Sequence, residues 1–407
     1  MNRTTRIVAL TLGAMVLALS AFVGGFAVSQ IVFVVDSART AQNAQLTSEV
    51  SDLFNLMQRE ALDPPSETTA TVGALNGLLR SNDDHYARFL PEEELQRYEE
   101  SMAGAFGGIG VLLGEDEGTT FVVQVYEDTP AEHAGIQEGD FFYGVDGETR
   151  NDWTISELSS RVRGEVGTDV EIIMVRPWDE DTMPTNMDHH LGDPFTVSVT
   201  RDIIQAPVTE VKTFDDNVGY VRLFDFNLRA TEELYADIEG LIEEGAESLI
   251  LDLRSNPGGD LNQAISVASL FIESGPIVQI EEAGQPEPVV LSVRGDQISQ
   301  QLPLVVLVNG NSASASEIVA AAIQDHDRGT VVGVETFGKG SVQTQIPFRN
   351  GAAFMTTAQY LSAHGRVIEG EGVAPDVEAE MSIADAAEEE TDTQLHAAIE
   401  EASAKQR

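Results

Sequence analysis

A run of serines, followed by a glycine loop that holds a lysine, is the stretch of this chain best suited to chemistry. Ser312, Ser314 and Ser316 lie in the sequence SASAS, between an apolar run over Leu304–Val308 and a helix-like run over Ser314–Asp325. A strand, a tight turn and a helix start of small residues is how several hydrolase folds present a nucleophilic serine. The unpaired N–H groups at such a helix start can bind a developing oxyanion.

The candidate base is Lys339, which stands in the sequence Phe-Gly-Lys-Gly. Of the 23 basic residues in the chain, only Lys212, Lys339 and Lys405 are lysines. An arginine cannot lose its proton in a protein, whereas burial lowers the pKa of a lysine side chain and favours its neutral form. A neutral amine close to a serine hydroxyl can act as a general base. We therefore predict Ser314 as the nucleophile and Lys339 as its base.

Two other interpretations compete with this dyad. The sequence from Ser314 to Glu317 fits a capping box, in which the serine hydroxyl is bound to a backbone N–H. A Ser–His–Asp triad would instead need a histidine near Ser314. His326 lies twelve residues further along the same expected helix, about 18 Å away, and His364 could approach only through folding. Since the chain also lacks a G-x-S-x-G pattern, the lysine dyad is favoured over a triad.

The sequences SASASEI and TFGKGSVQ resemble those of the carboxyl-terminal processing peptidases, also called tail-specific proteases. The resemblance extends in order over roughly Asp36 to Glu378. It implies that Ser314 is the nucleophile, that Lys339 is its base, and that Gln343 orients the amine. On a straight strand Lys339 and Gln343 would lie about 13 Å apart, so we expect the chain to bend between them. The resemblance also implies a core of the ClpP/crotonase type and no cofactor.

A second glycine loop follows an expected strand in the sequence LDLRSNPGGD, over Leu251–Asp260. Two glycines at a strand end let backbone N–H groups face a cleft, and a β–α turn that needs positive φ is the alternative interpretation. Tail-specific proteases contain the same run, in which one glycine N–H joins the oxyanion hole. The resemblance therefore implies Gly258 or Gly259 as one oxyanion donor and the N–H of Ala315 as the other.

A β-rich module is expected over Phe106–Arg201, and its sequences TPA, AGI, GD and VDG resemble the PDZ signature. PDZ domains bind extended C-termini by adding them as a strand beside a loop that holds the terminal carboxylate. The resemblance implies that Gly108, Ile109 and Gly110 form this loop, although an ordinary glycine turn is the alternative. Arg163, at the end of the second helix, is a further peptide-binding candidate, with a solvated surface arginine as the alternative.

Alternating strand-like and helix-like runs beyond Asp202 predict an α/β core. The expected strands of the two regions are Ile109–Leu113, Phe121–Val125, Phe141–Val145, Val170–Val175, Thr196–Thr200, Gly219–Phe224, Ser248–Leu253, Leu304–Val308, Thr330–Val334 and Phe354–Leu361. The expected helices are Thr47–Gln58, Thr69–Arg80, Pro130–Ala134, Thr154–Arg163, Thr231–Glu244, Leu261–Glu273, Ser314–Asp325 and Thr393–Ala404.

The N-terminal run Ile7–Val35 has 29 residues without a charge. As a helix it would be about 43 Å long, which exceeds the roughly 30 Å hydrocarbon core, so it can cross a bilayer with tilt. Arg3 and Arg6 precede it, which predicts a cytoplasmic N-terminus and a catalytic body outside the cell membrane. The small residues Ala27-Val28-Ser29 suit a signal peptidase, so a cleaved signal and a secreted or periplasmic body are the alternative.

The composition excludes several classes of function. The formal net charge of −45 repels nucleic acid and anionic lipid. The absence of cysteine excludes disulfides, thiolate metal sites and a cysteine nucleophile. In the long loop over Trp178–Pro194, adjacent His189 and His190 stand near Asp188 and Asp193 without a third ligand at a fixed spacing. An acidic surface loop is therefore expected there, and no metal site.

Taken together, the sequence predicts a multidomain α/β protein with a β-rich PDZ module inserted before its protease core. The expected segments are an anchor or signal over 1–36, a helical cap over 37–105, a PDZ domain over 106–202, a serine protease core over 203–380 and an acidic tail with a short helix over 381–407. The predicted function is a membrane-anchored serine endopeptidase that captures a protein's C-terminus and cleaves through an acyl-enzyme. The alternative is a tethered, inactive PDZ adaptor. The expected partners are proteins or peptides with accessible C-termini, and a homo-oligomer is left open.

Overall fold

The computed structural model describes residues 44–116, 119–150, 152–177, 192–295, 297–298, 302–381 and 391–406. The chain divides into two units, Met1–Phe89 and Leu90–Arg407. In the first unit residues 44–60 are helical, and α2 (Glu67–Leu79) begins at Ser66, whose hydroxyl accepts a hydrogen bond from the Thr69 N–H. The predicted membrane-spanning run Ile7–Val35 lies outside the described residues. Among the helices within them, none combines the length and the apolar character that a bilayer crossing requires.

A short two-stranded ribbon carries the β-rich module of the second unit. The strands β2 (Phe106–Gly108) and β9 (Asp202–Ile204) pair antiparallel, and α3 (Glu92–Ala103) precedes them. The guanidinium of Arg229 donates to the carbonyl oxygens of Gly104 at 2.7 Å and Ala206 at 3.2 Å. One side chain of the core therefore binds both linkers, so the module is an insertion that leaves and returns at one place.

The inserted module is a sheet with two short helices. Its strands are β3 (Val111–Asp116), β4 (Thr119–Val125), β5 (Phe141–Val145), β6 (Glu148–Thr149), β7 (Asp169–Val175) and β8 (Phe195–Thr200), and its helices are α4 (Pro130–His133) and α5 (Ile155–Val162). The sheet order is β3-β4-β5-β7-β8, with β6 paired to β5. Buried side chains that include Phe142, Trp153 and Leu158 form a cluster of their own. The predicted strand over Ile109–Leu113 begins instead at Val111, because the Ile109 carbonyl accepts the Ala131 N–H.

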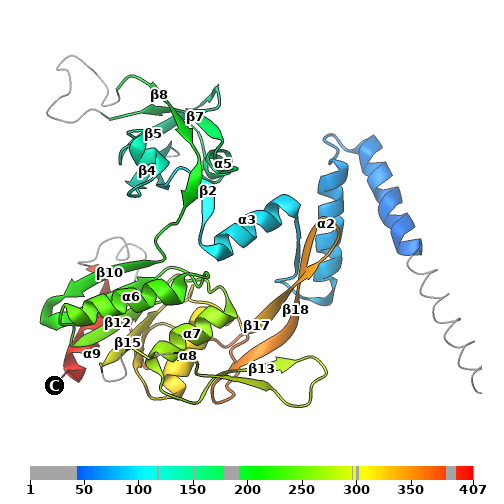
Figure 1. The fold of residues 1–407 in the computed structure, drawn as a ribbon. Coiled ribbons are helices and arrows are strands. Elements are labelled where there is room, and N and C mark those ends of the chain that lie inside the picture. Colours follow the sequence, from blue (N-terminus) through cyan, green and yellow to red (C-terminus); the bar gives the residue numbers. More distant parts are fainter. Residues whose placement is uncertain are drawn as a thin grey trace, which may run out of the picture. The chain divides into compact units, whose positions relative to one another are not determined.

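The core of the second unit is built on a mostly parallel sheet with the order β10-β11-β12-β15-β16-β19. Figure 1 labels its strands β10, β12 and β15. Its strands are β10 (Thr209–Phe214), β11 (Val218–Leu223), β12 (Ser248–Asp252), β15 (Leu304–Val308), β16 (Thr330–Gly333) and β19 (Val377–Glu378). Only β10 runs antiparallel to its neighbour. The central strands β12, β15 and β16 are buried throughout, which matches their continuous apolar sequences.

Helices cover both faces of this sheet because successive side chains of a strand point to opposite faces. Leu249, Leu251 and Leu253 pack with α6 (Ala230–Glu243), α7 (Leu261–Phe271) and α8 (Ala315–Asp325). Ile250 and its neighbours on the other face pack with α9 (Thr393–Lys405). The predicted C-terminal helix is thus present, and it packs on the core as a structural layer.

A second, antiparallel sheet contains strands that the sequence patterns did not predict. Its members in the second unit are β13 (Pro276–Glu282), β14 (Val289–Ser292), β17 (Ser341–Pro347) and β18 (Gly351–Ser362). Only β18 was expected, over Phe354–Leu361. β13 and β17 mix Gln, Glu or Thr with their apolar residues, and β14 is a strand of four residues, three of them exposed. None of the three shows the long apolar run by which buried strands are found.

The inserted module and the core have hydrophobic clusters of their own, which predicts two separable unfolding transitions. Leu158 lies in the cluster of the inserted module and Leu251 in that of the core, and neither side chain is exposed to solvent. Each Leu→Ala substitution should lower the stability of its own domain by about 2–5 kcal/mol, because it leaves a cavity. Calorimetry would measure both transitions, and fluorescence of Trp153 in a Trp178→Phe background would identify that of the module. An equal shift of both transitions by either substitution would contradict independent domains.

Candidate active site

Three loops meet at one edge of the core sheet. In register, Asp252 of β12 lies beside Leu307 of β15, and Val308 of β15 lies beside Gly333 of β16. Because these strands are parallel, the loops over 253–260, 309–314 and 334–340 follow their carboxyl ends at the same edge. The carboxyl ends of parallel strands are where α/β proteins bind their ligands.

Ser314 stands out from its two neighbouring serines by its contacts. The hydroxyl of buried Ser312 donates to the Leu253 carbonyl at 2.8 Å, and that of buried Ser316 donates to the Asn256 carbonyl at 3.0 Å. Both therefore join loops together. Ser314 is the half-buried N-cap of α8 with φ 58° and ψ −113°, a conformation that residues with a side chain rarely adopt. Such strain is typical of functional sites, where the surrounding structure holds it in place.

Glu317 connects the Ser314 turn to the Lys339 loop. This carboxylate is fully buried and accepts four hydrogen bonds, from the Ser314 N–H at 2.8 Å, the Thr336 hydroxyl at 2.6 Å, the Gly338 N–H at 2.7 Å and the Lys339 N–H at 2.9 Å. Ser314 and Glu317 do adopt the capping-box arrangement, but the serine hydroxyl makes no capping hydrogen bond of normal geometry. In this arrangement the hydroxyl oxygen faces the Glu317 N–H only as an acceptor, so the capping box does not use the hydroxyl's own proton.

The Lys339 loop is held on both sides of the lysine. The Lys339 carbonyl accepts a hydrogen bond from the Tyr360 hydroxyl. The Gly338 carbonyl accepts the Gly370 N–H at 2.8 Å, and the Gly340 N–H donates to Glu369 at 2.7 Å. A Cβ atom at Gly340 would lie 2.5 Å from the Glu369 nitrogen, so only glycine fits there. The half-buried Lys339 side chain thus extends from a fixed backbone.

The Gln343 side chain has a buried oxygen that can still accept a hydrogen bond. Its amide nitrogen donates to the Thr356 hydroxyl at 2.6 Å, while its buried Oε1 has no hydrogen-bond partner within the part of the chain that the structure describes. A buried unpaired acceptor is costly, which suits an atom that receives a proton donor during the reaction. The pairing of β17 with β18 shifts register between Val342 and Gln343, so the strand is irregular between the lysine and the glutamine, as the sequence required.

The oxyanion candidates lie around Ser314. A Cβ atom added to Gly258 would come within 2.7 Å of the Ser314 Cβ and 2.9 Å of the Ala315 nitrogen, which shows how closely this glycine packs on Ser314. The Gly258 N–H donates to the Asn256 side chain at 2.9 Å and is therefore occupied. Among the backbone bonds between described residues, the N–H groups of Gly259 and Ala315 take no part. These two N–H groups are the better pair for binding an oxyanion.

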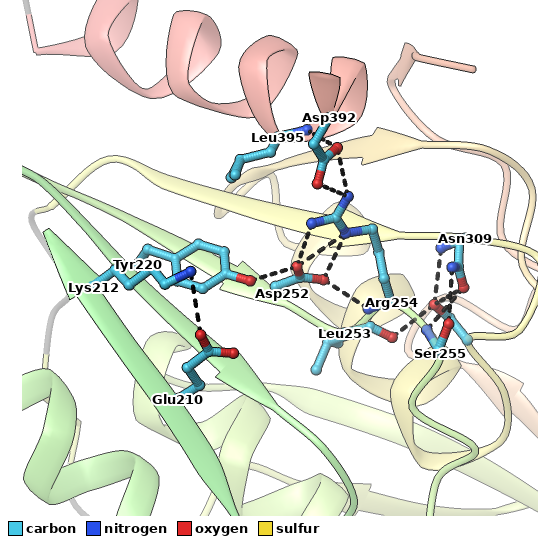
Figure 2. A network of polar contacts seen from close by, with 11 residues as sticks. Glu210, Lys212, Tyr220, Asp252, Leu253, Arg254, Ser255, Asn309, Asp392 and Leu395 are labelled. Carbon is cyan, nitrogen blue, oxygen red and sulfur yellow. Dashed lines mark hydrogen bonds and ion pairs between the residues drawn. The ribbon is translucent and has the colours of Figure 1, made fainter. Parts of the chain in front are cut away.

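A buried ionic network supports the turn that carries Gly258 and Gly259 (Figure 2). Arg254 binds the carboxylates of Asp252 and Asp392, and the Tyr220 hydroxyl donates to Asp252 at 2.8 Å. Burial, followed by the Asp252 charge, raises the pKa of Tyr220 above its usual range. Burial opposes the charge of Arg254, but the two carboxylates outweigh it and raise the pKa of the guanidinium. The contact between Asp392 and Arg254 could not be predicted from the sequence, because the two residues lie far apart along the chain.

The histidines that a catalytic triad would need lie at the other end of α8 from Ser314. His326 is the C-cap of α8, and its Nε2 contacts the Pro276 carbonyl at 2.7 Å. The His364 ring is centred 6.2 Å from that of His326, and the backbone N–H of His364 donates to the Asp325 carboxylate. The two histidines therefore lie beside each other and away from Ser314.

The inserted module contains a groove of about 280 Å³ along its edge strand. It is lined by Phe106, Gly108, Ile109, Gly110, Val111, Leu112, Leu113, Tyr126, Ile155, Ser159, Val162, Arg163 and Ala206. The strand β3 ends the sheet order and lies beside this groove, so its outer edge can accept an added strand. Gly108, Ile109 and Gly110 immediately precede β3, at the place the sequence assigned to the carboxylate loop.

Arg163 lies in this groove, over the ring of Phe106 at 3.9 Å from the centroid. Burial lowers the pKa of its guanidinium. The residue as a whole remains exposed at the C-terminal end of α5, so it is a partly desolvated cation near the predicted carboxylate loop, and a solvated helix-end arginine stays the alternative. The metal candidates Asp188, His189 and His190 lie outside the described residues, and Asp193 lies at their boundary. Within those residues, one exposed group of Asp128, Glu132 and His133 gathers possible ligand atoms.

The chain is similar to known proteins in both of its domains. Residues 217–379 match the family model of peptidase family S41, and residues 121–176 match that of the PDZ domain. The putative S41 protease of Bacteroides fragilis has a TM-score of 0.53 at 15% identity, over 84% of this chain and 92% of that one. This likeness shows a shared fold.

Two relatives extend the similarity along the sequence. The carboxy-terminal-processing protease of Bartonella bacilliformis is 33% identical over 375 residues, which cover 89% of this chain and 82% of that protein. The carboxy-terminal processing protease CtpA of Bacillus subtilis is 33% identical over 311 residues, which cover 76% of this chain and 64% of that protein. An identity of this extent, together with the two domain matches, means that the chain belongs to the carboxy-terminal processing serine proteases of peptidase family S41 and carries a PDZ domain.

Proposed function

We propose that this chain is a serine endopeptidase in which Ser314 and Lys339 form the catalytic dyad and the PDZ domain binds the free C-terminus of the substrate. The observation that carries the proposal is the bridge through Glu317, which joins the Ser314 N–H to the Lys339 N–H at a strained turn. The hydroxyls of Ser312 and Ser316 are bound to backbone carbonyls, which leaves Ser314 as the nucleophile.

The proposed reaction has two steps, acylation and deacylation, and the Lys339 amine transfers the protons in both. Neutral Lys339 takes the Ser314 proton as the hydroxyl oxygen attacks the scissile carbonyl, and the oxyanion lies at the N–H groups of Gly259 and Ala315. Collapse of this intermediate breaks the C–N bond, and the Lys339 ammonium gives its proton to the leaving amine. A water then loses a proton to Lys339 and attacks the acyl carbon. Collapse of this second intermediate breaks the bond to the Ser314 oxygen, which takes the proton back from the Lys339 ammonium, and the product leaves with a free carboxyl group. Gln343 Oε1 accepts a hydrogen bond from the amine and orients it.

The substrate's tail would occupy the PDZ groove as a strand beside β3. The backbone of Gly108, Ile109 and Gly110 supports binding of the terminal carboxylate, and Arg163 adds a positive charge in a protein whose formal net charge is −45. Such binding raises the local concentration of the nearby chain at Ser314. The proposed partners are therefore proteins and peptides with accessible C-termini.

The uncharged run Ile7–Val35 supports a cell-membrane anchor with an extracytoplasmic catalytic body, and a cleaved signal that releases this body is the alternative. The inactive PDZ adaptor is the less favoured function, because an adaptor has no use for a strained nucleophile turn, an unpaired Gln343 oxygen and two open N–H groups at one place.

The first prediction from this dyad concerns the base. Lys339→Arg keeps the positive charge but removes the neutral amine, because a guanidinium stays protonated. The rate kcat/KM for a protein with an apolar C-terminus should fall by about 10²–10⁴-fold, the usual contribution of a general base. Lys405→Arg, at the C-terminal end of α9, is the matched control and should keep full activity. A Lys339→Arg protein that retains more than a few percent of activity would point to another base.

The second prediction concerns the PDZ domain. Amidation of a substrate's C-terminus removes the carboxylate that the Gly108–Gly110 loop should hold, so cleavage should slow while acylation by a small serine-reactive probe changes little. The measurement is kcat/KM for a matched pair of substrates that differ only in this group. Equal cleavage of the free and amidated substrates would exclude recognition of the tail carboxylate.

The third prediction concerns pH. The reactive form carries a neutral Lys339, so kcat/KM should rise with pH as the ammonium loses its proton. An ordinary lysine side chain has a pKa of about 10.4, so the climb should lie on the alkaline side of neutrality. His326→Ala and His364→Ala should leave this rising limb in place. Selective loss of the chemical step in either histidine variant, with fold and tail binding intact, would restore the triad.

A further inference from the structure

We propose that Asp392, at the start of the C-terminal helix α9, is a positioning residue for the peptidase reaction. It acts through Arg254, which begins the turn that carries the Gly259 N–H. The inference rests on the proposed function because that N–H is a proposed oxyanion donor. Asp392 and Gly259 belong to different layers of the core, and the link between them is visible only in the folded chain.

Arg254 is held by two carboxylates (Figure 2). Its Nε and Nη2 donate to Asp252 at 2.9 Å and 2.7 Å, and its Nη1 donates to both oxygens of Asp392 at 2.9 Å and 2.7 Å. The exposed side-chain fractions are 10% for Arg254, 0% for Asp252 and 12% for Asp392. A charge so well shielded from water is stabilised by its ion-pair partners. Loss of one carboxylate should therefore weaken the hold on the Arg254 guanidinium.

The two carboxylates hold the arginine from different directions. Asp252 is two residues before Arg254 and also accepts the Arg254 N–H at 2.8 Å, so it binds the turn to its own strand. Asp392 belongs to the segment that packs on the opposite face of the sheet from α6, α7 and α8. It is also the N-cap of α9, where its carboxylate accepts the Leu395 N–H at 2.8 Å. Asp392 therefore joins the helix to the turn.

The residue that follows Arg254 needs such support. Ser255 has φ 56°, in the left-handed region that residues with a side chain rarely adopt. Its N–H donates to the Asn309 side chain at 2.9 Å, and the Asn309 amide donates back to its hydroxyl at 3.2 Å. The turn is thus strained at Ser255, bound to the nucleophile loop at Asn309 and anchored at Arg254. Release of the anchor would let the turn relax and carry Gly259 away from its position.

The substitution Asp392→Asn distinguishes the two roles of this side chain, the ion pair with Arg254 and the N-cap of α9. Asparagine is as good an N-cap as aspartate, so the bond to the Leu395 N–H can persist while the negative charge at Arg254 is removed. Ile399→Ala is the matched control, because Ile399 packs on the same cluster under α9 but lies two helical turns from the ion pair. It should lower the melting temperature of the core without touching Arg254.

The experiment compares kcat, KM and affinity for a peptidyl boronate, whose tetrahedral adduct with Ser314 places an oxygen in the oxyanion site. Asp392→Asn should lower kcat by about 10–100-fold, less than the roughly 10²–10³-fold that loss of a whole oxyanion donor costs. Its KM should change little, and its boronate affinity should fall in parallel with kcat. Ile399→Ala should keep the native kcat and boronate affinity at a temperature where it is folded.

Two results would overturn the inference. One is a folded Asp392→Asn protein with native kcat and boronate affinity, and the other is an Ile399→Ala protein that loses as much kcat. If the asparagine variant does not fold, Asp392→Ser, also a good N-cap, is measured against the same two criteria. A native protein that neither cleaves nor binds the boronate would instead contradict the proposed function, which keeps the two failures distinct.

Discussion

The buried carboxylate of Glu317 is the contact on which the proposed chemistry depends. It accepts hydrogen bonds from the N–H groups of Ser314, Gly338 and Lys339 and from the Thr336 hydroxyl. A buried carboxylate without hydrogen-bond partners would cost free energy. The fold is therefore most stable when all four donors stay in place around Glu317. The Ser314 turn and the Lys339 loop consequently share one anchor, and neither can shift without breaking hydrogen bonds to a fully buried carboxylate.

Two glycines allow the loops around Ser314 and Lys339 to pack closely against their neighbours. Gly258 packs on Ser314 so tightly that a methyl group would collide with it, and Gly340 is similarly confined by Glu369. Below this layer Arg254 and its two carboxylates hold the strained turn at Ser255. The chemistry therefore relies on a few positions where only glycine fits and on two buried ionic groups that hold loops in place. Pre-organised donors of this kind need no rearrangement when charge develops.

The sequence predicted the parts of this fold whose signals are local. β15 has the predicted bounds, and α8 begins one residue after its predicted start, because a continuous apolar run and a small-residue helix are strong patterns. The strands β13, β14 and β17 were missed because β13 and β17 mix polar with apolar residues and β14 is only four residues long. The roles of Glu317 and Asp392 could not be predicted, because the partners of a buried carboxylate come from segments that only folding brings together. The choice of Gly259 over Gly258 likewise needed the Asn256 side chain in place.

The most direct test of the central claim is to find which atom a substrate-like electrophile modifies. The folded protein would be treated with a peptidyl phosphonate that has a free C-terminal tail, and peptide mass spectrometry would locate the adduct. The account predicts a single adduct on Ser314, its absence in Ser314→Ala, and slow formation in Lys339→Ala. An adduct on Ser312 or Ser316, or one that persists in Ser314→Ala, would contradict it.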